Sequence, residues 1–138
     1  MNQAGEAESV LDASAVLALV LDERGAHRVD AALRRGALVS AVNWAEVMSD
    51  MAERGEETDF AAPRIKRLVE ELGKLTIVPF DEMQADETAR FRLRTRHVGL
   101  SLADRACLAL ARLHRLPVLT TDRAWRSLRI SVRIEVIR

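Results

Sequence analysis

Residues 8–23 read ESVLDASAVLALVLDE, and this stretch decides the fold class. Its short apolar beginning predicts a strand over residues 8–12, and the longer apolar segment that follows predicts a largely buried helix over 14–23. A strand that passes directly into a helix is the building unit of α/β proteins. Asp12 stands at the junction, where its side chain would lie at the carboxyl end of the strand.

The same alternation continues to the end of the chain. Further strands are predicted over 37–41, 75–78, 117–120 and 132–137, and helices over 26–35, 43–54, 58–72, 81–95 and 101–114, with a helical turn at 124–128. Short apolar strands separated by helices predict an α/β domain with a mainly parallel five-stranded sheet covered on both faces. In such sheets ligands bind at the carboxyl ends of the strands.

Length and composition predict one globular domain over residues 1–138, with residues 1–8 expected to be a flexible N-terminus. Hydrophobic residues make up 49% of the chain and charged residues 30%, which excludes wholesale disorder. The single cysteine, Cys107, excludes a disulfide framework and a multi-cysteine metal site. The N-terminus is polar and acidic, and no apolar run approaches the roughly 20 residues that span a bilayer. We therefore expect a cytoplasmic protein with no membrane segment.

The formal net charge of zero hides an uneven distribution of charge. Residues 1–89 contain 18 acidic and 9 basic residues, whereas residues 90–138 contain 12 basic and 3 acidic residues. This predicts a basic surface, supplied mainly by residues after 89, that attracts phosphate groups. The run RFRLRTRH at 90–97 has two open interpretations. It is either the end of a helix, where basic residues are favoured by the helix dipole, or a contact surface for an RNA backbone. The residues that would make such contacts are Arg90, Arg92, Arg94 and Arg96.

Acidic residues follow the strands or begin the helices at four places, namely Asp12, Glu46, Asp104 and Asp122. Taken singly, each is better explained as a residue that caps a helix or complements its dipole. Asn43 with Glu46 and Ser101 with Asp104 also have the spacing of a capping box. However, Asp104 shares a helical stripe with apolar residues at i+4 and i+7, so we expect it to point inward, where a carboxylate needs a cationic partner.

Taken together, the four acids suggest a metal site. Carboxylates that converge cannot all stay ionised unaided, because like charges raise one another's pKa. Oxygen ligands without histidine or cysteine suit Mg²⁺, or Mn²⁺, and one or two such ions can activate water at a phosphodiester. Nearby polar side chains are expected to orient the carboxylates through hydrogen bonds, and they are Ser14, Asn43, Thr120 and Thr121.

This pattern resembles the PIN domain and, within it, the VapC-type toxins of bacterial toxin–antitoxin pairs. The segments that carry the resemblance are VLDAS at 10–14, Asn43–Glu46, LSLADRACLALA at 100–111 and TTDRAW at 120–125. The likeness extends from about residue 9 to 136, although Ala103 stands where similar sequences often have glycine. It implies a three-layer α/β/α fold and a magnesium-dependent endoribonuclease that leaves 5′-phosphate and 3′-hydroxyl ends. It also implies that Asp12, Asp104 and Asp122 are metal ligands and that Glu46 is a ligand or orients the attacking water.

The resemblance further implies protein partners. One is a VapB-type antitoxin whose C-terminal segment lies along the cleft and brings a basic side chain to the metal site. The other is a second copy of the chain, for which Val47, Met48 and Met51 are expected to form an exposed apolar helix face. In contrast, helical spacing places Trp44 in the core, and Cys107 is expected to be buried and unreactive.

Other functions find less support in the sequence. The six glycines are too scattered for a phosphate-binding loop. A receiver domain would need a second acid after Asp12 and a lysine near the last strand, but Ala13 follows Asp12 and no lysine follows Lys74. Two alternatives remain, a PIN-like module that binds RNA or protein without cleavage, and a related metal-dependent DNA nuclease. A module that only binds should lack one of the four acids, and this chain keeps all of them. The DNA nucleases usually carry a long insertion, for which 138 residues leave little room.

Overall fold

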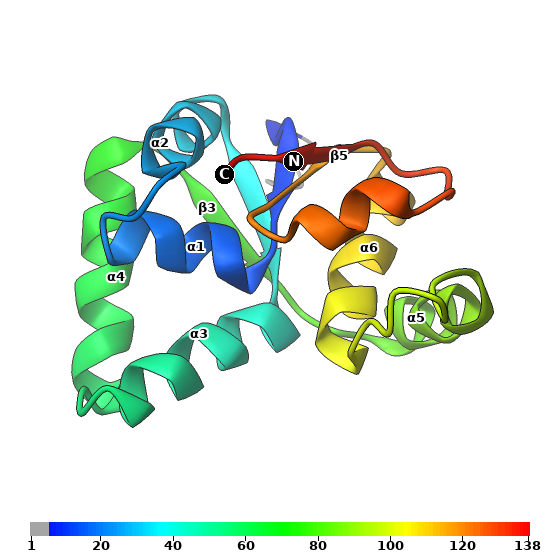
Figure 1. The fold of residues 1–138 in the computed structure, drawn as a ribbon. Helices are drawn as coiled ribbons and strands as arrows, with labels where there is room; N and C mark the ends of the chain where they lie inside the picture. Colours follow the sequence, from blue (N-terminus) through cyan, green and yellow to red (C-terminus); the bar gives the residue numbers. More distant parts are fainter. Residues whose placement is uncertain (1–5) are drawn as a thin grey trace.

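The computed structural model describes residues 6–138, so residues 1–5 of the expected flexible N-terminus lie outside the described residues. Its centre is a parallel sheet with the strand order β3-β2-β1-β4-β5 (Figure 1). The strands are β1 (Ser9–Leu11), β2 (Ala37–Ser40), β3 (Leu75–Val78), β4 (Val118–Thr120) and β5 (Ile134–Val136). The first three strands are added in one direction and the last two in the other. The topological switch point therefore lies between β1 and β4.

Helices cover both faces of this sheet, as the sequence predicts (Figure 1). One face carries α1 (Ala13–Val20), α2 (Ala26–Arg35), α3 (Ala41–Glu53) and α4 (Thr58–Leu72). The other face carries α5 (Glu82–Arg94), α6 (Leu102–His114) and the short 3₁₀ helix η2 (Arg123–Ser127). The predicted α/β/α architecture with a five-stranded sheet is confirmed, and within residues 6–138 every strand pair is parallel.

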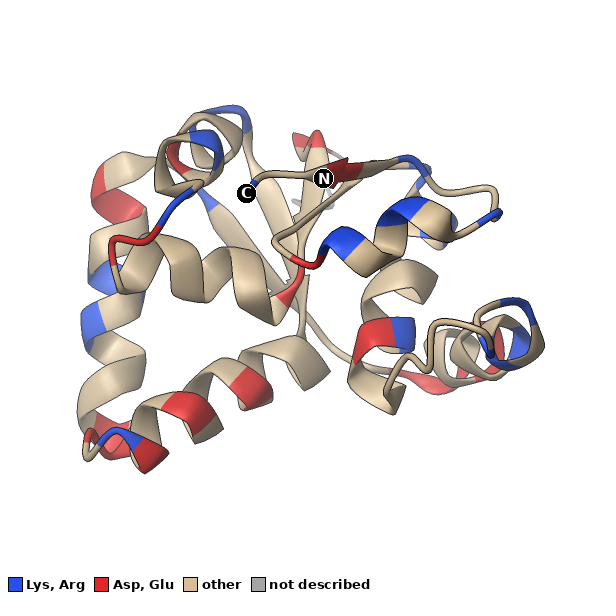
Figure 2. Ribbon diagram, in the orientation of Figure 1, with Lys and Arg blue, Asp and Glu red and all other residues tan. Residues whose placement is uncertain are grey.

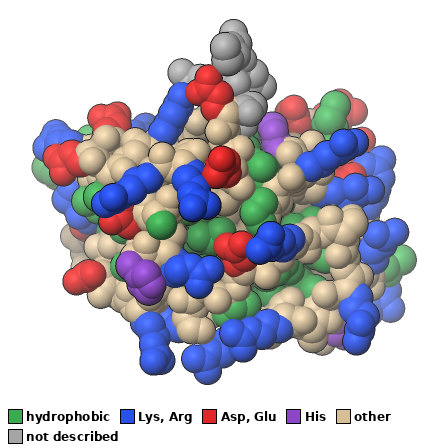
Figure 3. Space-filling view, turned by 90° about the horizontal axis from the view of Figure 1, so that it is seen from above, with side chains coloured by type: hydrophobic (Ala, Val, Ile, Leu, Met, Phe, Trp, Pro, Cys, Tyr) green, Lys and Arg blue, Asp and Glu red, His purple; other side chains and the backbone are tan. Residues whose placement is uncertain are grey.

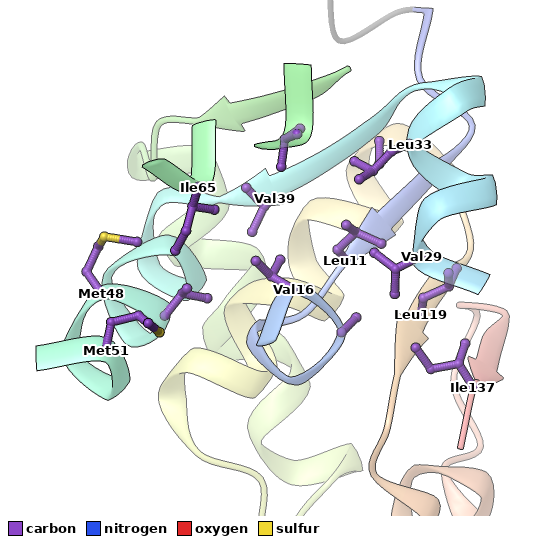
Figure 4. Packing of buried hydrophobic residues seen from close by; sticks show 14 of the residues in the cluster. Leu11, Val16, Val29, Leu33, Val39, Met48, Met51, Ile65, Leu119 and Ile137 are labelled. Atoms are coloured by element: carbon purple, nitrogen blue, oxygen red, sulfur yellow. The ribbon is translucent and has the colours of Figure 1, made fainter. Parts of the chain in front are cut away.

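Two buried clusters, one on each face of the sheet, hold these layers together. Side chains alternate between faces along each strand, so Leu11 and Leu119 join the cluster under α1–α4, whereas Val10 and Val118 join the cluster under α5 and α6. Figure 4 shows the first cluster, into which Leu11, Val16, Val39 and Leu119 converge. Burial of a large aliphatic side chain stabilises the fold by about 1.5–3 kcal/mol, so these layers supply most of the stability.

The apolar side of α3 belongs to this first cluster and is not a free surface. Val47, Met48 and Met51 are at most 5% exposed, and Figure 4 shows both methionines packed toward the core. The expectation that these three residues form an exposed dimer face is therefore wrong. The physical reason is that α4, together with α1, covers the side of α3 on which they lie.

The start of one helix differs from the sequence prediction, whereas the start of another agrees with it. Helix α3 begins at Ala41, because Ser40 at the end of β2 is its N-cap and accepts a hydrogen bond from the Val42 amide at 3.2 Å. Asn43 is therefore inside the helix, and the predicted capping box of Asn43 with Glu46 is wrong. The predicted capping box of Ser101 with Asp104 is confirmed at the start of α6.

A close approach of two chain segments fixes the entry into β3. The amide of Lys74 donates to the carbonyl oxygen of Leu33 at 2.9 Å, which joins the end of α2 to the loop before β3. A Cβ atom on Gly73 would lie 2.1 Å from the same carbonyl oxygen, so only glycine fits there. In the part of the chain that is described, no helix combines the length and the hydropathy needed to cross a membrane.

Candidate functional site

Asp12 is the most buried of the four acids, at 4% exposure, and it lies where β1 passes into α1. It caps α1, because its Oδ1 accepts hydrogen bonds from the Ala15 amide at 2.8 Å and from Ser14 Oγ at 2.6 Å. Its Oδ2 accepts from Thr120 Oγ1 at 2.5 Å. The pKa of Asp12 is raised from 3.8 to about 6, mainly by burial and to a smaller extent by the charge of Asp104, against the lowering effect of these three bonds.

Hydroxyl groups join the two sides of the switch point around this carboxylate. Ser14 Oγ, which follows β1, accepts from the Thr121 amide at 3.0 Å. Thr120 Oγ1, at the end of β4, accepts from the Asp122 amide at 3.1 Å and lies 3.3 Å from Ser14 Oγ. The carboxylate of Asp122 is exposed and caps η2 through the Ala124 amide at 2.9 Å. The capping interpretation and the site interpretation therefore apply to the same residues.

A buried amide joins α3 to the first turn of α6. Asn43 is 1% exposed, and its Nδ2 donates to Glu46 Oε1 at 3.1 Å and to the carbonyl oxygen of Ala103 at 3.0 Å. Its Oδ1 is also buried and has no hydrogen-bond partner within residues 6–138. Glu46 is exposed, but partial desolvation of its carboxyl group raises its pKa, against the hydrogen bond from Asn43, and the neighbouring charge of Asp104 adds to the rise. Asn43 thus holds Glu46 close to the residue that precedes Asp104.

Asp104 occupies a less buried position than the sequence predicts. Leu108 and Ala111 on its stripe are fully buried, but Asp104 is only half-buried because it lies in the first turn of α6. Its carboxylate accepts from the Ser101 amide at 3.1 Å, and its own amide donates to Ser101 Oγ at 3.1 Å.

Electrostatics show which acids are neighbours. The charge of Asp104 acts on Asp12 and on Glu46, and all three acids act on Cys107, which lies one turn after Asp104 in α6. Burial, with these charges, raises the pKa of the Cys107 thiol, so this thiol stays protonated as expected for a core residue. Figure 2 shows the acidic segments at the starts of α1 and η2, near the start of α6 and along α3 around one region.

The chemistry of these donors fits a hard divalent cation, which prefers carboxylate and hydroxyl oxygens. Within residues 6–138 none of the four acids forms an ion pair with a basic side chain. As the side chains stand, no three acidic, histidine or cysteine residues of the described chain are close enough to hold one ion together. The carboxylates of Asp104 and Asp122 point instead toward the backbone amides that they cap.

The arginine run is exposed near the end of α5. Arg90 donates to Glu87 Oε2 at 2.9 Å, so its charge is partly neutralised. No carboxylate of the described chain lies within 4 Å of the other three basic side chains, Arg92, Arg94 and Arg96. Figure 2 shows basic segments both at this end of α5 and along η2, and Figure 3 shows Lys and Arg side chains along the lower rim of the face seen from above.

Sequence reasoning missed two features of the site. The first is the contact of Asn43 with Ala103, which crosses from α3 to α6. The spacing of Asn43 with Val47 and Met51 along one buried stripe could have indicated that this amide points inward. The second is that Thr121 contributes its backbone amide, which no side-chain pattern encodes. Trp125, whose position the sequence left open, is 1% exposed and packs in the second cluster.

Comparison with known proteins identifies the class. Residues 9–130 match the PIN domain family, and the chain belongs to this family. PIN domains are a family of nucleases, and the predicted PIN domain is thereby confirmed. No curated protein sequence matches the chain.

Solved structures of toxin–antitoxin proteins share the fold. A toxin–antitoxin complex from Klebsiella pneumoniae is 20% identical, with 92% of this chain and 100% of that chain covered and a TM-score of 0.65. VapBC2 from Rickettsia felis, bound to a DNA fragment from its promoter, is 13% identical, with 92% and 96% covered and a TM-score of 0.67. VapBC-5 from Mycobacterium tuberculosis is 24% identical, with 96% and 98% covered and a TM-score of 0.57. At these identities the likeness establishes the fold.

Proposed function

We propose that this PIN domain is a metal-dependent endoribonuclease and the toxin of a toxin–antitoxin pair. The observation that carries the proposal is the set of acids at the carboxyl edge of the sheet. Asp12, Glu46 and Asp104 come from three separate elements, lie close enough for the charge of Asp104 to raise the pKa of the other two, and form no ion pair within residues 6–138. A cation supplied from solution relieves this repulsion.

Each residue has a role in this proposal. Asp12, Asp104 and Asp122 would hold Mg²⁺, or Mn²⁺, directly or through water. When bound, such an ion supplies a Lewis acid at the phosphodiester and activates water. Glu46, fixed by Asn43, holds a ligand position or accepts a hydrogen bond from the attacking water. The hydroxyls of Ser14 and Thr120 hold the Asp12 carboxylate in one orientation.

RNA is the proposed substrate, and the exposed arginines are the proposed contacts for its backbone. Arg92, Arg94 and Arg96 have no carboxylate of the described chain within 4 Å, so their charges can replace the counterions of a polyanion, which drives binding, whereas Arg90 is partly neutralised by Glu87. The proposed partners are a VapB-type antitoxin that blocks the site and a second copy of the chain, and the proposed location is the cytoplasm. The toxin–antitoxin assemblies among the structural neighbours support the antitoxin.

Sequencing of RNA ends from cells that express the chain tests this function. We expect new 5′-phosphate ends at defined positions, and we expect them to disappear in an Asp104→Asn variant. Asp86→Asn, at an exposed position of α5, is a matched control that should leave the cleavage map unchanged. Identical maps from wild type and Asp104→Asn would exclude the proposed nuclease.

A further inference from the structure

A hollow of about 310 Å³ lies toward the amino ends of the strands, away from the four acids at their carboxyl ends. Residues of β1, β4 and β5 form its floor, and one side of α2 forms its wall. Figure 3 looks onto this end of the molecule and shows charged side chains around apolar ones. Ligands of parallel sheets ordinarily bind at the carboxyl ends of the strands, so this hollow is separate from the proposed metal site.

The sequence of α2 creates the space. Arg28 and Arg35 are seven residues apart and lie on one side of the helix, with Ala31 and Ala32 between them on that side. The two short alanine side chains leave room between α2 and the sheet, and the two long basic side chains stand at either end of that room. Spacing along one helix therefore places two guanidinium groups beside one hollow.

A buried hydroxyl without a partner lies on the floor of the hollow. Ser9 is 6% exposed, and its Oγ accepts and donates no hydrogen bond within residues 6–138. Side chains alternate along a strand, so Ser9 shares the face of Leu11, which is the face that α2 covers. Its side chain is thus directed to the side on which it lines the hollow. A buried polar group without a partner is costly, and in a native protein it commonly meets a bound molecule.

The charges around the hollow are incompletely matched. Glu135 lies 3.6 Å from Arg28 and 3.4 Å from Arg133, so its charge is neutralised. Among the described residues no carboxylate lies within 4 Å of Arg35 and no basic side chain lies within 4 Å of Glu8, and both residues are exposed. The hollow therefore offers a cation for an oxyanion, a carboxylate for hydrogen-bond donors and the buried hydroxyl.

We infer that this hollow binds a ribonucleoside monophosphate, either a free nucleotide or the terminal nucleotide of an RNA strand. Arg35 and Ser9 donate to the phosphate oxygens, as guanidinium and hydroxyl groups commonly do. Glu8 accepts from the ribose hydroxyls, the role that acidic side chains have in other nucleotide sites. The volume of about 310 Å³ is in the range of small-molecule sites. The assignment goes beyond the proposed nuclease function and does not depend on it.

Calorimetric titration of the full chain with adenosine 5′-monophosphate in EDTA tests the site without a metal ion. We expect saturable binding that weakens about tenfold in Arg35→Gln, because a charge-assisted hydrogen bond is lost. The 2′-deoxy nucleotide should bind more weakly than the ribonucleotide, and Glu8→Ala should remove this difference. Arg67→Gln, at an exposed position of α4 outside the hollow, is the matched control.

Ser9→Ala separates ligand binding from a structural role. Removal of a hydroxyl that has no partner should leave the Tm of the unliganded chain unchanged or higher, whereas the affinity for the nucleotide should fall about fivefold. Asp104→Asn should leave nucleotide binding unchanged, because Asp104 lies at the other end of the strands.

Competition between the free nucleotide and a 5′-phosphorylated RNA oligonucleotide, with the Asp104→Asn chain in EDTA, identifies the source of the ligand. Displacement by the oligonucleotide assigns the hollow to an RNA end, and its absence assigns the hollow to a free nucleotide, and both results support the site. Failure of both ligands to bind, or an affinity that neither Arg35→Gln nor Ser9→Ala changes, overturns the proposal. Loss of binding in Asp104→Asn also overturns it, because the nucleotide then occupies the acidic site. Each of these outcomes is independent of RNA cleavage.

Discussion

Replacement of Asp12 by asparagine should stabilise the metal-free protein while it abolishes activity. The carboxylate is 4% exposed, and burial raises its pKa from 3.8 to about 6. At pH 8 the native state must therefore hold a charge that its surroundings disfavour. A shift of about 2 pKa units corresponds to about 3 kcal/mol, which is the largest gain that removal of this charge can bring.

The hydrogen bonds of Asp12 reduce this gain. Asparagine can keep the oxygen that accepts from the Ala15 amide and Ser14 Oγ, but its NH₂ group would replace the oxygen that accepts from Thr120 Oγ1. The Thr120 hydroxyl must then donate elsewhere, and Ser14 Oγ at 3.3 Å is the available acceptor. A poorer bond costs about 1 kcal/mol. We expect a net gain of about 1–2 kcal/mol, or on the order of 5 °C in Tm.

The contribution of Asp12 to the free energy of unfolding should change with pH in one direction, which can be tested directly. Between pH 3.8 and about 6 the native state binds the Asp12 proton more tightly than the unfolded state does. The contribution of this residue to the free energy of unfolding therefore falls as pH rises through that window, and it is regained as pH falls. The asparagine variant lacks this dependence, so the two proteins should converge near pH 4 and differ most above pH 7.

Thermal and urea unfolding in EDTA at pH 5 and pH 8 measures the difference. Added Mg²⁺ should raise the Tm of the wild type and have less effect on Asp12→Asn, because the ion binds only the native site. Asp86→Asn, at an exposed position of α5, serves as the control. A lower Tm for Asp12→Asn than for wild type in EDTA at pH 8, or parallel pH profiles, would refute the reasoning.

Three further predictions follow from single side chains or short runs of them. Thr120→Val removes the hydroxyl that donates to Asp12 Oδ2 at 2.5 Å, so the pKa of Asp12 should rise further. The affinity for Mg²⁺, measured by calorimetry, should fall several-fold because the carboxylate is no longer held in one orientation. An unchanged affinity would contradict this orienting role of Thr120. Gly73→Ala should lower the free energy of unfolding by more than about 1 kcal/mol in urea, because the alanine Cβ would lie 2.1 Å from the Leu33 carbonyl oxygen. An unchanged free energy of unfolding would mean that the loop before β3 can move aside. Arg92, Arg94 and Arg96 are exposed at the end of α5 and just after it, and their replacement by alanine should weaken RNA binding. The slope of the logarithm of the binding constant against the logarithm of the salt concentration should fall by roughly one unit for each phosphate that an arginine neutralises. An unchanged slope would favour the helix-dipole interpretation of these arginines.

Local patterns predicted most of the fold and most of the grouping of the site. The α4 and β3 boundaries agree with the sequence because a glycine or proline ends each element, whereas the start of α3 was misplaced because Ser40 acts both as the last residue of β2 and as the N-cap. Asp12 and Asp122 were expected at one sheet edge because each follows a strand, and the order of the strands brings those two ends together.

Contacts between distant segments could not be predicted in the same way. Asn43 meets Ala103 across 60 residues of sequence, and the position of α6 relative to α3 decides that contact. The burial of Met48 is a similar case, because helical periodicity identifies an apolar side but does not show what covers it. The half-exposure of Asp104 follows from its place in the first turn of α6, which the periodicity argument ignored.

Cleavage of a labelled RNA oligonucleotide by the purified chain, beside a DNA oligonucleotide of the same sequence, tests the central claim most directly. With Mg²⁺ present we predict cleavage of RNA by the wild type, none in EDTA, and a loss of at least roughly a hundredfold in Glu46→Gln, the contribution of a general base. Cleavage that persists in EDTA, or equal rates for wild type and Glu46→Gln, would contradict the account.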